Sequence, residues 1–241
     1  MTLEDWLRPR AFLQPVVDLR ARIDAAIGAV EIPRLPIPDW ERYRADFTAG
    51  IPVLHSADAG VDLDVTVKAM DALAAKLEAE TGSAPDPGTL RYASWTVLSI
   101  SLRPVVEAFA EWRDDDRWLR RHCPTCSSLP AMAQLAGADP GRRRYLACGG
   151  CGTRWRFGRT ACPFCEVESS RLTSLSIDGE AGLRIDFCES CRGYLKTYNG
   201  QGDEHVLLAD WTSLHLDVLA RDRGLFRTAA SLYELEPVAA R

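Results

Sequence analysis

Apolar residues recur every three or four positions through the first half of the chain, which is the spacing of amphipathic α-helices. The first such stretch covers residues 9–30, with Phe12, Leu19 and Ile23 on one stripe and charged residues off it. An amphipathic helix is therefore predicted here, with this stripe facing a core.

A second and a third helix are predicted next. Residues 39–49 begin at Asp39, a suitable N-cap, and stop before a glycine. Residues 62–80 place Val65 and Leu73 inward and also end at a glycine. Both segments have the start and stop residues that are typical of helices.

A fourth helix starts at Asp86 and Pro87, which form a cap followed by a proline at the first helical position. Pro104 lacks a backbone N–H, so it should break or kink this helix. Together these elements predict an all-α bundle over residues 1–120.

In the second half the pattern changes to short strand-like segments separated by glycines. They cover residues 129–135, 144–147, 153–157, 172–177, 183–187 and 194–198. Asp178-Gly179 predicts a hairpin turn between the fourth and fifth segments. A last helix is predicted over residues 210–222, with Trp211, Leu214 and Val218 on its inner face.

All eight cysteines lie among these strands, in four Cys-x-x-Cys pairs: Cys123/Cys126, Cys148/Cys151, Cys162/Cys165 and Cys188/Cys191. Each pair is a turn that aims two thiolates at one point, and two pairs supply the four sulfurs of a tetrahedral metal site. Twenty-one residues separate the first two pairs, twenty-two the last two and ten the middle two. This spacing predicts a duplicated unit. It favours sequential pairing, with one site per unit, and a crossed pairing is the alternative.

The donor set limits the chemistry of these sites. Four sulfurs and no histidine within either unit predict closed sites, which are structural or electron-transfer sites and not hydrolytic ones. Zinc and iron both accept four thiolates, so two metal ions, zinc or iron, are predicted. Dithiol catalysis is less favoured, because each Cys-Pro-x-Cys is followed by a turn and a strand, not a helix. Each unit is small, so metal is expected to supply folding energy.

Charge and composition narrow the function further. The 241 residues carry a formal net charge of −5, which disfavours generic binding to nucleic acid. The first residues do not resemble a signal peptide, and no apolar run is long enough to cross a membrane. Metal-bound thiolates suit a reducing compartment, so a cytoplasmic protein is expected. Common catalytic and phosphate-binding motifs are missing from the sequence, so no enzyme is predicted.

A basic stretch accompanies the cysteines between residues 140 and 165, where there are six arginines, no acidic residue and several aromatic residues. One interpretation is charge compensation beside a thiolate–metal site. The other is a partner surface, for a protein more than for nucleic acid, because the second unit is acidic. The candidate contact residues are Arg142, Arg143, Arg144, Trp155 and Arg156.

These motifs resemble those of the formate dehydrogenase accessory (formation) proteins over essentially the whole chain. The residues that carry the resemblance are Cys-Pro-Thr-Cys-Ser-Ser-Leu-Pro at 123–130, Arg-Tyr-Leu-Ala-Cys-Gly-Gly-Cys at 144–151, Trp155, Cys-Pro-Phe-Cys-Glu at 162–166, Cys-Glu-Ser-Cys at 188–191, Tyr-Leu-Lys-Thr at 194–197 and Ala-Asp-Trp-Thr-Ser-Leu-His-Leu-Asp at 209–217. Gly-Ile-Pro-Val-Leu at 50–54 is a weaker match. The family tail usually has two successive acids, whereas here Trp211 follows Asp210, so Asp210 is a candidate contact on an altered partner surface.

The resemblance implies an α+β multidomain protein. Its parts would be a helical domain (1–120), two rubredoxin-like four-cysteine domains (121–160 and 161–204) and a C-terminal helix and tail (205–241). It implies a cytoplasmic, non-catalytic assembly factor that binds the catalytic subunit of respiratory formate dehydrogenase before export. The eight cysteines would be its metal ligands and would be implicated in partner binding. A rubredoxin-like electron-transfer partner of that enzyme and a zinc-ribbon nucleic-acid binder are the alternatives.

Overall fold

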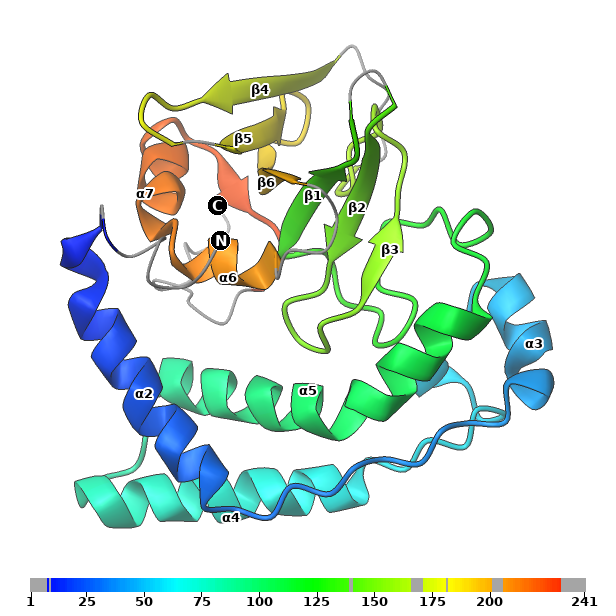
Figure 1. The fold of residues 1–241 in the computed structure, drawn as a ribbon, viewed down its shortest axis with the longest axis vertical. Helices are drawn as coiled ribbons and strands as arrows, with labels where there is room; N and C mark the ends of the chain where they lie inside the picture. The colour runs from blue at the N-terminus through cyan, green and yellow to red at the C-terminus, as the bar shows by residue number, and fades with distance from the viewer. Residues whose placement is uncertain are drawn as a thin grey trace.

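The fold combines a layer of helices with one mixed β-sheet, and two further helices lie beside the sheet (Figure 1). The computed structural model describes residues 8, 10–138, 141–165, 171–180, 182–200 and 206–230. Within these ranges, no helix has both the length and the apolar character needed to cross a membrane. The mixed α and β content agrees with the predicted fold class.

The helical layer begins near the N-terminus and ends before the first cysteine. Its elements are a 3-10 turn (Ala11–Leu13), α2 (Gln14–Gly28), α3 (Trp40–Ala49), a second 3-10 turn (Val53–His55), α4 (Asp64–Thr81) and α5 (Pro87–Trp112). The Asp39 carboxylate accepts a hydrogen bond from the backbone N–H of Glu41 at 3.1 Å. Asp86 caps α5 through the N–H groups of Gly88 and Thr89, at 2.9 and 3.1 Å. Both predicted N-caps are confirmed.

Helix α5 runs through Pro104 as a single helix of 26 residues, so the predicted alternative of a break is wrong. Its axis changes direction part-way along in Figure 1. A bend is expected where proline removes a backbone donor and crowds the preceding turn. The backbone N–H of Leu35 donates to the carbonyl of Ser101 at 2.9 Å, which fastens the connector between α2 and α3 to this part of α5.

Four side chains predicted to face the core are exposed instead, with exposed fractions between 41% and 61%: Phe12, Leu19, Val65 and Val218. Only the second half of α2, where Ile23 and Ile27 are buried, packs in the core formed with α4 and α5. On α4, Thr66 is fully buried while its neighbour Val65 faces outward. On the last helix, Leu216 and Ala220 take the inward positions.

The six predicted strands are present, and a short seventh strand joins them. Their bounds are β1 (Met132–Ala136), β2 (Arg143–Ala147), β3 (Arg154–Arg156), β4 (Leu172–Ser176), β5 (Leu183–Cys188), β6 (Gly193–Gly200) and β7 (Phe226–Arg227). They form one sheet in the order β3-β2-β1-β6-β5-β4, with β7 beside β6. Pairs within each unit are antiparallel, whereas β1 and β6 are parallel, with Met132 opposite Lys196.

The two four-cysteine units therefore follow each other head to tail in a single sheet. Each unit contributes its third, second and first strand in the same order, and the first strand of one unit pairs with the third strand of the other. No break in the sheet separates the described strands of the two units, although a domain boundary was predicted at residue 160. The boundaries at 120, 160 and 204 stay sequence predictions.

Two short helices, α6 (Val206–Trp211) and α7 (Leu214–Asp222), replace the single helix predicted over residues 210–222. The chain turns at Ser213, whose hydroxyl donates to the carbonyl of Ala209. A side chain that bonds the helix carbonyls in this way competes with continuation of the helix. Both helices lie along one side of the sheet (Figure 1).

The helical layer shares one core with both cysteine units. Phe109, Trp118 and Trp155 are buried in the same cluster as Cys123. The backbone N–H groups of residues 53 and 54 donate to the carbonyls of residues 124 and 125, each at 2.9 Å. The apolar segment around residues 50–54 thus holds the first cysteine turn against the helices.

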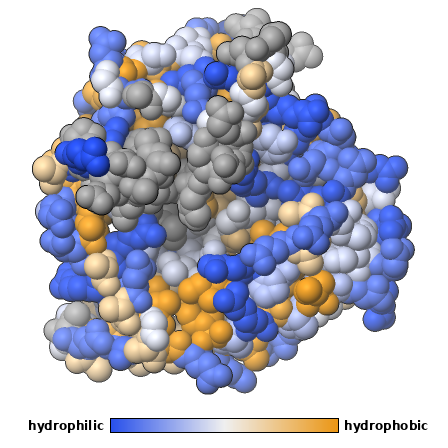
Figure 2. Space-filling view, in the orientation of Figure 1, coloured by the Kyte–Doolittle hydropathy of each residue, from blue (hydrophilic) through white to orange (hydrophobic). Residues whose placement is uncertain are grey.

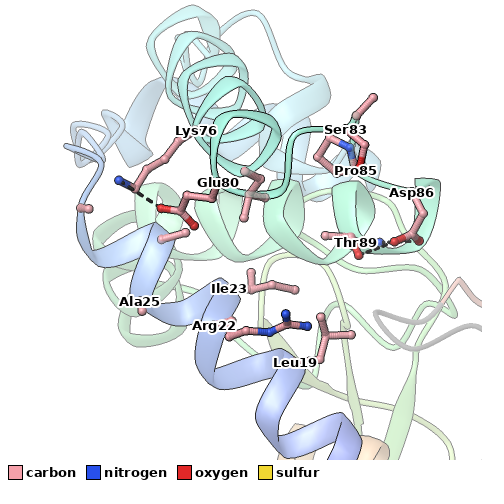
Figure 3. Close-up of a pocket in the computed structure, with 14 residues that line it drawn as sticks. Leu19, Arg22, Ile23, Ala25, Lys76, Glu80, Ser83, Pro85, Asp86 and Thr89 are labelled. Atoms are coloured by element: carbon pink, nitrogen blue, oxygen red, sulfur yellow. Dashed lines mark hydrogen bonds and ion pairs between the residues drawn. The ribbon is translucent and has the colours of Figure 1, made fainter.

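The helical layer also carries a groove of about 680 Å³ between α2, the end of α4 and the start of α5 (Figure 3). Ile23 and Leu77 contribute apolar surface to it, and an ion pair between Lys76 and Glu80, at 3.4 Å, lies at its edge. Apolar residues gather over the helical layer in Figure 2, whereas the upper part of that face is mostly polar. No cysteine lines the groove, so it is separate from the cysteine clusters.

Candidate metal centres

The fold gathers the eight cysteines into two groups, one in each unit. In each group the four sulfur atoms all lie within 4.8 Å of one another. The first group is Cys123, Cys126, Cys148 and Cys151, and the second is Cys162, Cys165, Cys188 and Cys191. This is the sequential pairing that the spacing predicted, and not the crossed alternative.

The distances between sulfur atoms fit tetrahedral metal sites. Two Sγ–Sγ distances in the first group are 3.4 and 3.5 Å, and two in the second are 3.7 and 3.8 Å. A metal–sulfur bond of about 2.3 Å places the corners of a tetrahedron about 3.8 Å apart, whereas disulfide sulfurs are about 2.05 Å apart. All eight cysteines are free. Each group therefore has the donor set and the dimensions to hold one ion.

The cysteine turns share an unusual backbone conformation. The residue after the second cysteine has a positive φ in three of the turns, with 68° at Ser127, 77° at Gly152 and 59° at Arg192. The corresponding residue of the remaining turn, 166, lies outside the described residues. Positive φ is uncommon for residues other than glycine. Its recurrence at the same position therefore shows that the two units use the same turn geometry.

Backbone N–H groups point at three of the sulfurs. The donors are the N–H groups of Thr125, Phe164 and Gly193, each 3.4 Å from the sulfur of the cysteine two positions earlier. Hydrogen bonds to a charged group favour its charged form. These contacts therefore stabilise thiolates, which is the form that binds metal.

Three cysteines of the first group are buried, and two hydroxyl groups lie beside its sulfurs. The Thr153 hydroxyl lies 3.1 Å from the Cys151 sulfur, and the Ser128 hydroxyl lies 3.3 Å from the Cys126 sulfur. Burial raises the pKa of the Cys123 and Cys151 thiols well above their usual range. Four thiolates in such a site need a cation to compensate them, so the first group is suited to a metal ion.

The second group lies closer to solvent, because Cys165 and Cys191 are only half-buried. Burial nevertheless raises the pKa of Cys191 to about 12. Gly193 passes close to this group, and a Cβ there would lie 2.8 Å from Phe164 Cδ2 and 2.9 Å from Thr228 Oγ1. The backbone at residue 193 therefore has no room for a side chain.

The structure corrects the predicted partner surface. Three of its six candidates are buried and cannot contribute to a surface, with exposed fractions of 3% or less: Arg144, Trp155 and Asp210. The other three retain exposure: Arg142, Arg143 and Arg156.

Strand alternation explains part of this division. Residues 143 and 145 lie on one face of β2, and residues 144 and 146 lie on the opposite face. Trp155 is opposite Leu146 in the ladder, and its indole N–H donates to the carbonyl of Arg120 at 2.9 Å. Arg144 and Trp155 therefore belong to the interior.

Asp210 belongs to a buried ion network on α6, α7, β6 and β7. Its carboxylate accepts two hydrogen bonds from Arg227, both at 2.8 Å, and lies 2.9 Å from Lys196 Nζ. Lys196 and Arg227 also pair with Asp217, at 2.7 and 2.9 Å, and Tyr194 donates to Asp217 at 2.7 Å. Burial alone would raise the pKa of Asp210, but Arg227 and Lys196 lower it to about 2.

Sequence reasoning missed this network, although one sequence feature could have revealed it. Lys196 is the single charged residue within the apolar and aromatic strand Tyr-Leu-Lys-Thr-Tyr. A lysine in such a strand is rarely buried without a paired charge. The identity of the partners depends on contacts between distant segments of the chain.

Comparison with known proteins gives the family context of these clusters. Residues 122–159 match the family model described as "FdhE, central domain". The FdhE homolog of Pseudomonas aeruginosa is 38% identical over 123 residues, which cover 47% of this chain and 39% of that protein. FdhE of Escherichia coli O9:H4 (strain HS) is 32% identical over 143 residues, which cover 56% and 45% of the two chains. The chain spans less than half the length of these curated relatives.

A solved structure extends the likeness of the fold to nearly the whole chain. The crystal structure of the FdhE protein from Pseudomonas aeruginosa superposes with a TM-score of 0.61, covering 95% of this chain and 92% of that one. The sequence identity over the superposition is 24%, so this match shows a shared fold alone. Residues 122–159 are therefore similar to the FdhE central domain, and the resemblance predicted from the cysteine motifs is confirmed.

Proposed function

We propose that this chain is a non-catalytic assembly factor that binds the catalytic subunit of a respiratory formate dehydrogenase in the cytoplasm, before that subunit is exported. The observation that carries this proposal is the pair of four-cysteine clusters on one sheet, in a chain with an FdhE central domain. Sites with four protein sulfurs leave no coordination position for a substrate. A binding role therefore fits this chain better than catalysis.

In this proposal the eight cysteines bind two metal ions, zinc or iron, one in each cluster. The sulfur spacing and the N–H groups aimed at the sulfurs support this assignment. The ions would fix the cysteine turns and, through them, the ends of the strands. The sheet would then be a rigid platform for the partner.

The partner contact is proposed on the exposed face of β2 and β3. Arg143 and Arg156 retain exposure there, and Arg142 lies half-buried just before β2. The Arg154 guanidinium lies over the Tyr145 ring, 5.2 Å from its centroid. Arginine and aromatic side chains are enriched in protein interfaces. An acidic region of the catalytic subunit would complement this surface.

Copurification of the metal-loaded protein with a formate dehydrogenase catalytic subunit tests the proposal. Arg143→Glu reverses a charge on the exposed face, and we expect it to weaken capture of that subunit about tenfold, since one disrupted interface charge pair costs on the order of 1–2 kcal/mol. Arg42→Glu, a matched reversal on the exposed side of α3, should leave capture unchanged. Failure of the intact, metal-loaded wild-type protein to capture the subunit would contradict the proposal.

Electron transfer to the same subunit is the second candidate. Two sulfurs of the second cluster are half-buried, and N–H groups donate to sulfurs there. Solvent exposure and such hydrogen bonds set the reduction potential of iron–sulfur sites. Iron bound at these sites and reversible reduction of the purified protein would support this function. Protein that binds only zinc in its native host would exclude it.

A further inference from the structure

Arg144 is the arginine of the basic stretch that the fold buries. It extends from β2 of the first unit, and its residue is 3% exposed. Its Nη1 donates to the carbonyl of Ala161 at 3.0 Å. Ala161 directly precedes Cys162, the first ligand candidate of the second cluster. A guanidinium from one unit therefore lies behind the cysteine turn of the other.

No carboxylate pairs with this guanidinium among the described residues. The acid that faces it, Asp186, is already bound by Arg184 at 2.7 Å and by the hydroxyls of Ser174 and Thr197 at 2.6 and 2.7 Å. The Nε of Arg144 is buried and has no hydrogen-bond partner within the described part of the chain. The pKa of Arg144 is still lowered, so the charge of Asp186 offsets only part of the cost of burying this cation.

The second cluster can supply further negative charge. Four thiolates around a divalent ion carry a net charge of −2, and around a trivalent ion −1. The pKa of the Arg144 guanidinium is lowered by burial, and Asp186 and Cys162 are the groups that oppose this effect. Arg144 and the loaded cluster would each stabilise the other's buried charge.

The two clusters differ in the groups that surround their sulfurs. Hydroxyl groups of Ser128 and Thr153 contact sulfurs of the first cluster. Among the described residues, only backbone N–H groups make such contacts in the second, from Phe164 and Gly193. Among the described residues, the second cluster therefore lacks the hydroxyl contacts of the first.

We infer that Arg144 is a positioning residue of the second metal site: a strand of the first unit provides the buried counter-cation that holds the second unit in its metal-loaded form. This inference rests on the metal binding proposed above. It predicts that the two units are not independent, because loss of one side chain in the first unit weakens metal retention in the second.

The test uses the full chain loaded with two zinc ions and measures the rate at which each cysteine is alkylated, by mass spectrometry of its peptides. Metal-bound thiolates react slowly, so the rate reports metal retention at each cluster. In Arg144→Gln we expect Cys162, Cys165, Cys188 and Cys191 to react about 10- to 100-fold faster, as for loss of other outer-shell partners. The cysteines of the first cluster should keep their wild-type rates.

Two control variants isolate the charge. Arg143→Gln, on the same strand with its side chain on the opposite face, should leave both clusters unchanged. Arg144→Lys keeps a positive charge, so the cysteines of its second cluster should stay largely protected from alkylation. This variant also tests the inference if Arg144→Gln does not fold. The inference is wrong if Arg144→Gln speeds alkylation equally at both clusters, or does not speed it selectively at the second. It is also wrong if Arg144→Lys fully loses the protection of the second cluster. Wild-type protein that binds no zinc would instead contradict the proposed metal binding.

Discussion

Single residues are most tightly constrained around the cysteine turns. Ser127 and Arg192 accept a backbone conformation that side chains usually avoid. Gly193 is constrained differently, because Phe164 and Thr228 occupy the space where a Cβ would lie. The turns therefore impose both a conformation and a volume limit on the residues beside the sulfurs.

Gly193→Ala tests this volume limit. The added methyl group would overlap Phe164 and Thr228, so we expect the free energy of unfolding of the metal-loaded protein to fall by about 1–3 kcal/mol. Gly28→Ala is the matched control, because a Cβ at Gly28 meets no atom within 4 Å. Urea unfolding of both variants makes the comparison. Equal stability of the two variants would show that the backbone at residue 193 shifts to accept a side chain.

Among the elements, the C-terminal helices are held by a buried ion network as well as by apolar packing. Lys196 on β6 and Arg227 on β7 each contact both Asp210 and Asp217. The network joins elements that are far apart in the sequence. It fixes α6 and α7 against the sheet, so its loss should affect both helices at once.

Asp210→Asn tests the energetic weight of this network. Removing the carboxylate leaves Arg227 and Lys196 incompletely compensated in the interior, so we expect a loss of about 3–5 kcal/mol in the free energy of unfolding at pH 7. Asp222→Asn, at an exposed position of α7, should change stability by less than about 0.5 kcal/mol. Denaturant unfolding of the two variants measures the difference.

The pH dependence of this effect follows from the pKa of Asp210. The pKa is about 2 in the folded protein and about 3.9 in an unfolded chain, so the carboxylate stabilises the fold fully above pH 4. This stabilisation is lost as the pH falls through about 2. The destabilisation caused by Asp210→Asn should therefore be the same at pH 5 and at pH 7. A deficit that vanished between pH 7 and pH 5 would contradict the assigned ion pairs.

At the scale of the whole molecule, both cysteine clusters are part of the main core. Trp118 and Trp155 are buried with Cys123, Cys148 and Cys151 in one cluster that also contains residues of α3 and α5. A second helical cluster, formed by α2, α4 and the first half of α5, contains no cysteine among its members. The two parts of the helical layer should therefore respond differently to metal removal.

Removal of metal by a chelator tests this division. We expect the near-ultraviolet circular dichroism of the tryptophans to collapse, because the packing around Trp118 and Trp155 depends on the cysteine turns. Much of the far-ultraviolet helical signal should remain, because the core of α2 and α4 lies apart from the clusters. An unchanged tryptophan signal in metal-free protein would contradict a structural role for the ions.

Much of the secondary structure and of the candidate metal sites could be predicted because it depends on nearby residues. Asp39 and Asp86 cap the helices they were expected to cap. The cysteine pairing follows from two loops of similar length, each closed by strands. Exposure was harder to predict, since the apolar stripe of α2 extends beyond the helices that cover it and leaves Leu19 exposed.

Most of the helices, the strands and the grouping of eight cysteines into two sites could be predicted from the sequence, because capping, periodicity and the spacing of the cysteine pairs act over short stretches of chain. The tertiary fold sets the pairing of β1 with β6, which joins the two units into one sheet. It also decided that Arg144, Trp155 and Asp210 lie inside the protein and not on a partner surface. These outcomes depend on which distant segments of the chain come into contact. The sequence pattern of a basic stretch is the same whether its side chains face solvent or a buried cluster.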